Sequence, residues 1–320
     1  MVKLWACALI TGVAALVWNV LPAAAADRLH VVATTGMIAD AVTEIGGPDV
    51  TVTALMGAGV DPHSYRQTRA DILAMGEADL VLWHGLYLEA QLEDFMADLS
   101  RHRAVVALAD TLPRGALRAS EDYADRFDPH VWMDPALWQD VVIAARDALI
   151  TADPAGADAY TTRAADYVAR IKALDAYAHD ILGTVPDHAR VLVTAHDAFG
   201  YFGRAYGFEV LGVQGLSTDS EAGLARIEDL VSRLVDDRIG AVFVESSVSD
   251  RNLRALVEGA AARGHEVAIG GQLYSDAMGA PGTYEGTYIG MIDHNVTQIA
   301  RALGGAAPVD GLNGQLGGVR

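Results

Sequence analysis

The chain has 320 residues, of which 52% are hydrophobic and 20% charged, and its formal net charge is −19. Such an acidic protein repels nucleic acid and anionic membrane surfaces, so we expect no nucleic-acid partner, and it mildly attracts cations. Acidity also keeps a secreted protein soluble, so the charge is consistent with a cation ligand but does not identify one.

The first 26 residues have the pattern of a secretory signal peptide. Lys3 is the only charged residue before Asp27, residues 4–20 are almost wholly apolar, and the small residues 23–26 suit cleavage after Ala26. A transmembrane anchor is the alternative, but the apolar run is short for a bilayer of about 30 Å and no basic stop-transfer cluster follows it. We therefore expect export to the periplasm and removal of residues 1–26.

The single cysteine, Cys7, lies inside this leader. Cleavage would remove it, and a lipid-anchor cysteine would stand at the cleavage junction. We therefore expect a mature protein without a disulfide, a thiolate metal ligand or a lipid anchor. The remaining chain of about 290 residues can bury a stable core without disulfides and suggests two domains of about 150 residues each.

Strand and helix patterns alternate after the leader. Apolar strand patterns at 29–34, 50–56, 79–83 and 104–108 are separated by helical stretches at about 37–45, 68–75 and 88–99. Short apolar runs between helices indicate βαβ units and a mainly parallel sheet. We expect an N-terminal α/β lobe over residues 27–153.

Residues 154–182 predict one long helix. Pro154 suits the first turn, Gly183 suits the end, and apolar residues recur between them at three- and four-residue steps. At 1.5 Å per residue such a helix is about 42 Å long, enough to run the length of two domains. A surface helix of a single domain is the alternative. We expect a stiff connection between two lobes rather than a flexible linker.

The alternation resumes after this helix. Strand patterns at 190–194, 208–213, 241–245 and 266–269 alternate with helical stretches near 198–206, 221–236 and 252–263. These patterns predict a C-terminal α/β lobe over residues 183–320. The expected fold is therefore α/β, with two lobes of mainly parallel sheets joined by a single long backbone helix.

Three of the ten histidines stand at chain positions typical of ligand sites. His63 lies in the loop after the second predicted strand, His196 comes two residues after the fifth, and His130 precedes a helix that Pro135 can begin. Asp276 likewise follows the last predicted strand. Ligands bind beyond the carboxyl ends of parallel strands, so two facing lobes would bring these four side chains to one cleft.

Three neutral imidazoles and one carboxylate form an ordinary site for a divalent transition metal. Their wide separation along the chain matches no short zinc motif such as HExxH, so spacing alone is weak evidence. The other histidines are expected to have structural or surface roles: His30, His84, His265 and His294 buried or half-buried, and His102, His179 and His188 on the surface. His84 closes a strand and is the most notable of them.

Supporting residues follow from the same positions. Glu245 ends a predicted strand, and we expect it to accept an N–H from a ligand imidazole and fix its tautomer. Capping of the next helix is the alternative role for this carboxylate. Trp132 and Tyr274 flank ligands and are expected to limit access of water, and Asp134 is expected to cap the helix that begins at Pro135.

Several long motifs carry a resemblance to a known family. They are DPHSY at 61–65, DPHVWMDP at 128–135, TAHDAFGYFGRAYG at 194–207, QGLSTDSEA at 214–222, FVESS at 243–247, GGQLYSDAMG at 270–279 and YIGMIDHN at 288–295. With these motifs in order, the chain from about residue 29 to residue 303 resembles the solute-binding proteins of metal-specific ABC transporters, the TroA-like (cluster A-I) family of zinc and manganese receptors.

The resemblance implies two α/β lobes joined by one rigid helix, with one Zn²⁺ or Mn²⁺ ion held between them as the transported ligand. The family's four metal ligands fall on His63, His130, His196 and Asp276. It also implies a periplasmic protein that delivers its ion to an ABC permease and its ATPase, and we expect it to act as a monomer.

Two departures from relatives leave the identity of the ion open. Dedicated zinc members commonly carry a long His-rich loop before the second ligand, whereas residues 116–127 here are short, acidic and free of histidine. Members usually assigned to manganese often have Glu as the third ligand, whereas this chain has His196. Nitrogen-rich sites bind zinc more tightly by the Irving–Williams order, but availability and geometry can override that order.

Two functions other than that of a receptor are compatible with parts of this pattern. A zinc site with an open coordination position could hydrolyse a substrate, but four protein ligands would close the coordination sphere. The chain also lacks the GxSxG, GxxxxGK[ST] and HExxH motifs, so we expect no enzyme activity. A metal-buffering protein or adhesin without a transporter is the other alternative, because a permease and an ATPase would be separate chains.

Overall fold

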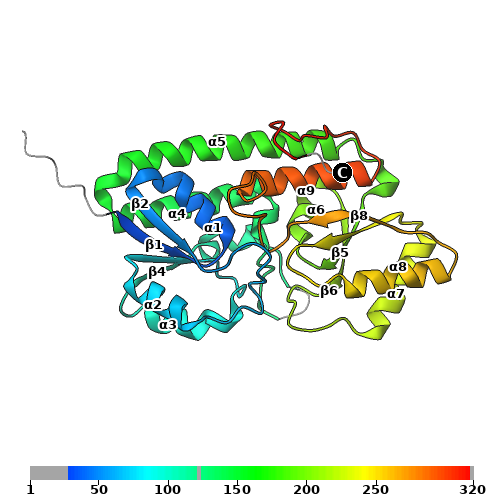
Figure 1. Cartoon of the computed structure of the whole chain (residues 1–320), viewed down its shortest axis with the longest axis horizontal. Helices are drawn as coiled ribbons and strands as arrows, with labels where there is room; N and C mark the ends of the chain where they lie inside the picture. The colour runs from blue at the N-terminus through cyan, green and yellow to red at the C-terminus, as the bar shows by residue number, and fades with distance from the viewer. Residues whose placement is uncertain (1–27, 121–123, 318–320) are drawn as a thin grey trace, which may run out of the picture.

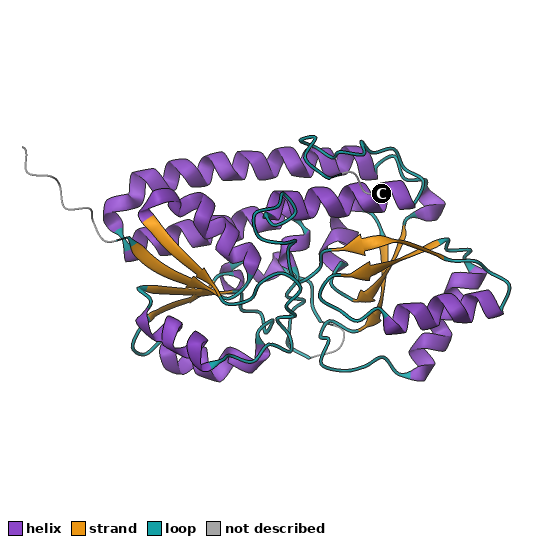
Figure 2. Ribbon diagram, viewed as in Figure 1, coloured by secondary structure: helices purple, strands orange, loops and turns teal. Residues whose placement is uncertain are grey.

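The computed structural model describes residues 28–120 and 124–317, so the predicted signal peptide lies outside the described residues. Two α/β lobes lie side by side, and long helices run across both of them (Figure 1). Each lobe contains a four-stranded parallel sheet with helices packed against it (Figure 2). The predicted fold class is confirmed, while the domain boundaries stay predictions.

The N-terminal sheet has the strand order β2-β1-β3-β4. Its strands are β1 (Leu29–Ala33), β2 (Val50–Ala54), β3 (Leu80–Trp83) and β4 (Ala104–Ala107), and the helices of this half are α1 (Gly36–Gly46), α2 (Arg69–Glu77), α3 (Glu93–Leu99) and α4 (Pro135–Ala152). Alternate residues of β3 enter different cores: Leu80 and Leu82 pack with α1 and α4, whereas Val81 and Trp83 pack with α2 and α3. Both faces are covered, which explains the continuous apolar strand in the sequence.

The C-terminal sheet repeats this arrangement with the order β6-β5-β7-β8. Its strands are β5 (Val191–His196), β6 (Glu209–Gln214), β7 (Ala241–Glu245) and β8 (Ala268–Leu273), and its helices are α6 (Gly200–Tyr206), α7 (Leu224–Asp236), α8 (Arg251–Ala262) and α9 (Tyr288–Ala302). In both sheets the first strand lies between the second and the third. Chain connections therefore diverge beside β1 and β5, the place where open parallel sheets form their binding crevice.

Helix α5 (Ala157–Leu182) has 26 residues, is about 39 Å long and runs along both lobes (Figure 1). Its buried residues recur at alternating four- and three-residue steps: Tyr160, Ala164, Tyr167, Ile171, Leu174, Ala178 and Ile181. That spacing keeps one apolar face in register along the whole helix. Pro154 does not enter the α-helix, because Pro154–Gly156 form a preceding 3₁₀ turn.

Helix α9 also crosses the junction and was not among the predicted helices. It packs along α5, and Thr287 caps its first turn by accepting from the Gly290 amide. The Tyr288 amide donates to Asp40 of α1 at 3.1 Å, and the Tyr288 hydroxyl donates to the Trp132 carbonyl at 2.9 Å. Two hydrogen bonds from Tyr288 therefore connect α9 to the N-terminal lobe.

The helix predicted at 88–99 is shorter in the structure. Only Glu93–Leu99 is α-helical, because Leu86 and Tyr87 adopt positive φ and the chain turns before the helix begins. The buried carboxylate of Glu89 accepts from the amides of His84 and Gly85 and from Thr34, which holds this turn against β1 and β3. These tertiary contacts override the helical pattern.

The strand predicted at 266–269 begins later and continues to Leu273. A register shift between Val242 and Phe243 of β7 absorbs an extra residue in β8. Gly271 has φ +138°, and a Cβ there would collide with the Gln298 side chain. A β-bulge with a glycine at the strained position thus carries the strand through a Gly-Gly pair.

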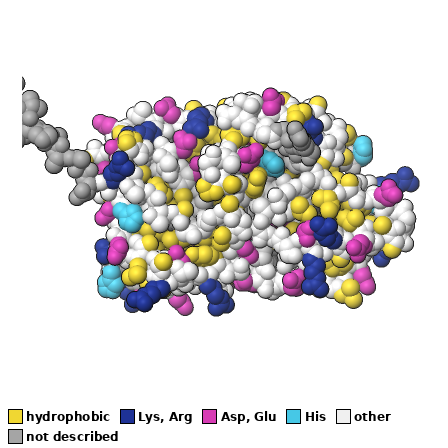
Figure 3. All heavy atoms as spheres, in the orientation of Figure 1, with side chains coloured by type: hydrophobic (Ala, Val, Ile, Leu, Met, Phe, Trp, Pro, Cys, Tyr) yellow, Lys and Arg dark blue, Asp and Glu magenta, His cyan; other side chains and the backbone are white. Residues whose placement is uncertain are grey.

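No helix within the described residues is long and apolar enough to cross a membrane. On the face shown in Figure 3, acidic, basic and apolar side chains are interspersed, and the acidic ones do not gather into one patch. On this face, therefore, the net negative charge offers no concentrated surface for collecting cations.

Two glycines test the packing of α9. A Cβ at Gly290 would collide with the Tyr284 backbone carbonyl, whereas a Cβ at Gly76 of α2 would meet nothing within 4 Å. We expect Gly290→Ala to lower the free energy of unfolding by about 1–3 kcal/mol through overpacking. Gly76→Ala should raise it by about 0.5–1 kcal/mol through better helix propensity. Urea unfolding of both variants measures the difference, and an equal effect of the two substitutions would contradict the packing of α9.

Candidate metal centre

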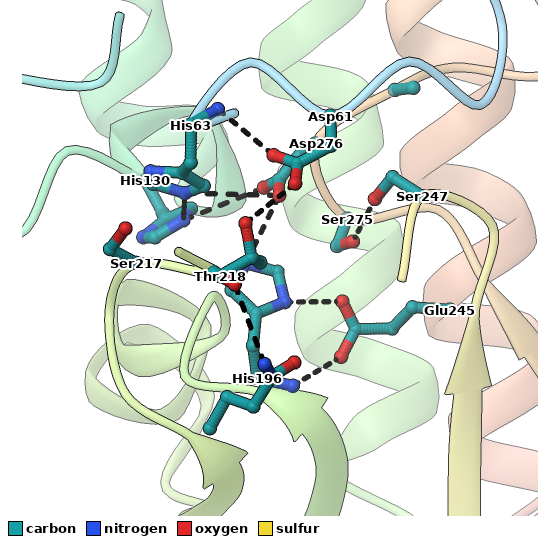
Figure 4. Close-up of polar contacts among 12 residues, drawn as sticks. Asp61, His63, His130, His196, Ser217, Thr218, Glu245, Ser247, Ser275 and Asp276 are labelled. Atoms are coloured by element: carbon teal, nitrogen blue, oxygen red, sulfur yellow. Dashed lines mark hydrogen bonds and ion pairs between the residues drawn. The ribbon is translucent and has the colours of Figure 1, made fainter. Parts of the chain in front are cut away.

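Four side chains converge at the carboxyl ends of the two sheets (Figure 4). His63 follows β2, His130 precedes α4, His196 ends β5 and Asp276 follows β8. One nitrogen or oxygen atom of each lies within 4.8 Å of those of the other three, and the residues are at most 3% exposed. The structure thus brings together all four residues singled out from the sequence. Two of them precede α5 in the chain and two follow it.

Their polar atoms face a common point. His63 Nε2 lies 3.2 Å from His130 Nε2, and His196 Nε2 lies 3.1 Å from Asp276 Oδ2. The other Asp276 oxygen, Oδ1, lies 3.5 Å from His130 Nε2. Among the described residues, His196 Nε2 and both Asp276 oxygens are buried without an aligned hydrogen-bond partner. Since buried polar atoms are nearly always paired, this arrangement is typical of a cation site.

The tripeptide Asp-Pro-His occurs at both histidines that the N-terminal lobe contributes to the site, at 61–63 and at 128–130. The His63 amide donates to Asp61 Oδ1 at 2.9 Å, and the His130 amide donates to Asp128 Oδ1 at 3.0 Å. Each aspartate folds the chain back two residues later, as short polar side chains do in Asx-turns. Asp61 additionally accepts from the Thr218 hydroxyl at 2.5 Å, a contact between the lobes.

Asp128 contacts a candidate ligand and was not singled out from the sequence. Its Oδ1 lies 2.8 Å from His130 Nδ1, and its Oδ2 accepts from Arg118 at 2.9 Å. A carboxylate on Nδ1 keeps the proton there and leaves the Nε2 lone pair free for a metal. The repetition of Asp-Pro-His at two candidate ligands was the signal that could have identified it.

His196 belongs to β5 rather than to the loop beyond it. The predicted strand ended two residues earlier, but pairing of His196 with Gln214 of β6 extends it. Glu245, the last residue of β7, accepts from the His196 amide at 2.9 Å and lies 2.6 Å from His196 Nδ1 (Figure 4). Both oxygens of Glu245 therefore orient this one histidine.

The loop that carries Asp276 is anchored on its own lobe. Asn295 of α9 accepts from the Tyr274 amide at 2.9 Å and donates to the Tyr274 carbonyl at 2.7 Å. Ser275 Oγ lies 3.0 Å from Ser247 Oγ (Figure 4). Asn295 lies on α9, a helix that was not predicted, so its contact with this loop was not expected from the sequence.

The remaining singled-out residues lie beside the ligands or away from them. Trp132 is buried against His130, with ring centroids 5.2 Å apart, and the Tyr274 ring lies against His294 at an interplanar angle of 59°. Asp134 caps α4 as predicted. His84 is buried, with Nε2 2.7 Å from the Pro129 carbonyl. The other histidines are half-buried or exposed outside the site: His30, His102, His179, His188, His265 and His294.

Burial and charge act differently on the ligands. Burial lowers the pKa of His63 to about 3, although Asp276 acts in the opposite direction. Burial alone would also lower the pKa of His196, but the carboxylates of Asp276 and Glu245 outweigh it and hold that pKa well above its ordinary value. Burial would raise the pKa of Asp276, yet the imidazoles, His196 foremost, hold it well below the usual range. A protonated His196 ring and the carboxylates of Asp276 and Glu245 would therefore stabilise each other.

A comparison with protein families adds independent information. The family described as ZnuA, zinc-uptake complex component A periplasmic, matches residues 31–302. The match runs from β1 to the end of α9 and includes all four converging side chains. The chain belongs to this family.

Two relatives are each 47% identical to this member of the family. The manganese-binding lipoprotein MntA of Bacillus subtilis (strain 168) aligns over 277 residues, 87% of this chain and 90% of the relative. The zinc-binding protein TroA of Treponema pallidum (strain Nichols) aligns over 281 residues, 88% of this chain and 91% of the relative. The solved structure of periplasmic zinc-binding TroA from Treponema pallidum is 46% identical, has a TM-score of 0.84 and covers 86% of this chain and 99% of that one. The resemblance stated from the motifs is confirmed.

One expectation is wrong by the same comparison. We expected a protein that is not lipid-anchored, but the Bacillus subtilis relative is named a lipoprotein, and so are the relatives from Halalkalibacterium halodurans and Streptococcus mitis. The expectation rested on the position of Cys7 and on a cleavage site after Ala26, both of which lie outside the described residues. The family description agrees with the periplasmic compartment.

The protonation states of His196 and His63 can be observed directly. In protein stripped of divalent metal by a chelator, we expect the His196 ring to stay protonated at pH 7, because its pKa is raised by two carboxylates. His63 should stay neutral down to about pH 3. NMR signals of the histidine rings, followed against pH, measure both protonation states. A neutral His196 at pH 7 would show that the carboxylates do not outweigh burial in setting its pKa. Glu245→Gln should lower the His196 pKa, since one of the two carboxylates is then neutral.

Proposed function

We propose that this protein is the solute-binding component of a metal ABC transporter and holds one divalent ion with His63, His130, His196 and Asp276. The observation that carries the proposal is the set of buried atoms without aligned partners, His196 Nε2 and both Asp276 oxygens, which face the Nε2 atoms of the other two histidines. A divalent cation at their common point would satisfy all of them at once.

The ion is Zn²⁺ or Mn²⁺ as transported substrate. Three imidazole nitrogens favour zinc by the Irving–Williams order, and two Asp276 oxygens offer the extra donor that manganese accepts readily. Relatives carry names with either metal, and an iron-binding protein of Yersinia pestis, YfeA, is 30% identical. Metal supply therefore decides occupancy along with affinity.

Substrate-binding proteins of this family work with a membrane permease and its ATPase. We further propose that this chain acts as a monomer and binds no nucleic acid, in keeping with its net charge of −19. The ligands come in pairs from the two lobes, so capture replaces the waters of the ion with groups from both sides. Because α5 and α9 both cross the junction, the accompanying movement is small.

We propose that the site performs no catalysis. A catalytic zinc site keeps a position for water and usually has a free general base beside it. Here four protein ligands, one with two available oxygens, fill the coordination sphere. The two neighbouring carboxylates are engaged in other contacts and are not free to act as a general base. Glu245 contacts His196, and Asp128 contacts His130 and Arg118.

Binding stoichiometry tests the site. The metal-stripped protein should bind one Zn²⁺ per chain, and competition should show tighter binding of Zn²⁺ than of Mn²⁺. His63→Ala and Asp276→Ala should each abolish tight binding, whereas His102→Ala, which removes an exposed histidine, should not. Isothermal titration with a competing chelator measures this. Several weak ions per chain, unaffected by these substitutions, would point to the acidic surface instead.

The role of Glu245 is tested by a change of one atom. Glu245→Gln cannot accept the Nδ1–H of His196 in the same way, so the zinc dissociation constant should rise about 10- to 100-fold. Glu228→Gln on the exposed face of α7 removes the same charge far from any ligand and serves as the control. An equal effect of the two substitutions would assign the change to overall charge rather than to His196.

A further inference from the structure

We infer that Trp132 is a positioning residue that sets the place of Asp276 relative to His130 and thereby the coordination geometry of the captured ion. The inference rests on the proposed function, because it concerns the ion held by these ligands. Trp132 is itself no ligand, since its indole N–H is only a donor.

One side chain links the two halves of the site. The Trp132 ring packs edgewise against His130, with centroids 5.2 Å apart and planes at 64°, and it is fully buried. Its Nε1–H donates to the Ser275 carbonyl at 2.8 Å. Trp132 therefore contacts a ligand ring of the N-terminal lobe and the backbone next to a ligand of the C-terminal lobe.

This hydrogen bond acts on Asp276 through the backbone. The Ser275 carbonyl and the Asp276 amide belong to the same planar peptide unit, so holding the carbonyl also orients the Asp276 Cα. Asn295 and Ser247 fix the loop to its own lobe, whereas Trp132 fixes it to the opposite one. Without the indole donor, the Ser275 carbonyl has to find another partner, because a buried carbonyl is rarely left unpaired.

Two further residues, Tyr288 and His84, contact Trp132. Its carbonyl accepts from the Tyr288 hydroxyl at 2.9 Å, and its ring meets His84 edge-on with centroids 5.0 Å apart. His84 in turn lies 2.7 Å from the carbonyl of Pro129, next to His130. These contacts fix the position of the indole, which packs against His130 on one side and donates to the backbone next to Asp276 on the other.

Zinc coordination makes this placement consequential. Zn–N and Zn–O distances span only about 2.0–2.2 Å, so a small displacement of Asp276 changes whether one or both oxygens reach the ion. Asp276 offers Oδ1 toward His130 and Oδ2 toward His196. None of the groups in the Trp132–Ser275 contact binds metal, so the contact is independent of the ion and prepares the site for it.

A matched pair of substitutions tests the inference. Trp132→Phe keeps a buried aromatic ring and removes the N–H donor. Trp138→Phe makes the same change at another fully buried tryptophan, whose N–H has no hydrogen-bond partner among the described residues and whose ring stacks on Tyr288. Zinc dissociation constants come from chelator competition, and the visible absorption of the Co²⁺-loaded protein reports coordination number.

We expect Trp132→Phe to raise the zinc dissociation constant about 10-fold and to shift the Co²⁺ bands, while Trp138→Phe changes neither by more than about twofold. Wild-type affinity and spectrum in Trp132→Phe would overturn the inference. So would equal changes in both variants, because they would assign the effect to lost core volume. If the wild-type protein binds neither ion, the proposed function fails, and this inference fails with it.

A measurement on the wild-type chain covers the case in which Trp132→Phe does not fold. The described residues contain three tryptophans, Trp83, Trp132 and Trp138, so indole ¹⁵N–H signals can be assigned through Trp83→Phe and Trp138→Phe. We expect the Trp132 signal to show a hydrogen-bonded, slowly exchanging proton both before and after addition of Zn²⁺. Rapid exchange in the metal-stripped protein would overturn the inference, since the ion would then create the contact.

Discussion

The buried carboxylate of Asp276 is the constraint on which the rest of the site depends. Moving a carboxylate out of water is costly unless it is paired, yet both of its oxygens lack an aligned donor among the described residues. Its nearest polar neighbours are three imidazoles, which can offset the charge only by carrying a proton or by sharing a cation with it. A divalent metal removes the conflict entirely, because it accepts electron pairs from all four groups at once.

The surroundings of the candidate ligands favour donation of electron pairs to a metal. Two of the three histidines have a carboxylate at or near Nδ1, Asp128 for His130 and Glu245 for His196, and each carboxylate also accepts the backbone amide of its own histidine. A negative carboxylate thus lies behind each of these two rings, and behind Asp128 lies the positive guanidinium of Arg118. A carboxylate behind a neutral imidazole raises its basicity, and Arg118 offsets part of the charge of Asp128.

The sequence was sufficient for the parts of this arrangement that are local. Apolar runs located the strands of both sheets. Positions after strand ends for His63, His196 and Asp276, and before a helix for His130, singled out the four converging side chains. It was insufficient wherever a distant segment decides the outcome. Extension of β5 to His196 depends on pairing with β6, the bulge in β8 depends on β7, and the turn before α3 depends on Glu89 reaching His84. Trp132 contacts the loop of Asp276 through one hydrogen bond and Asn295 contacts it through two, each from more than twenty residues away, and no periodicity in the sequence reveals such contacts.

The same electrostatics that favour a metal also favour a proton. Asp276 and Glu245 hold the pKa of His196 above its ordinary value, so a proton on that ring and a metal ion at its Nε2 are competing ways to neutralise the two carboxylates. A receptor that must release its cargo benefits from such a competitor, since the carboxylates are not left unpaired when the ion departs. His196 and both of these carboxylates belong to the C-terminal lobe, so the exchange of a proton for the ion can be balanced within that lobe, while His63 and His130 of the other lobe complete the site.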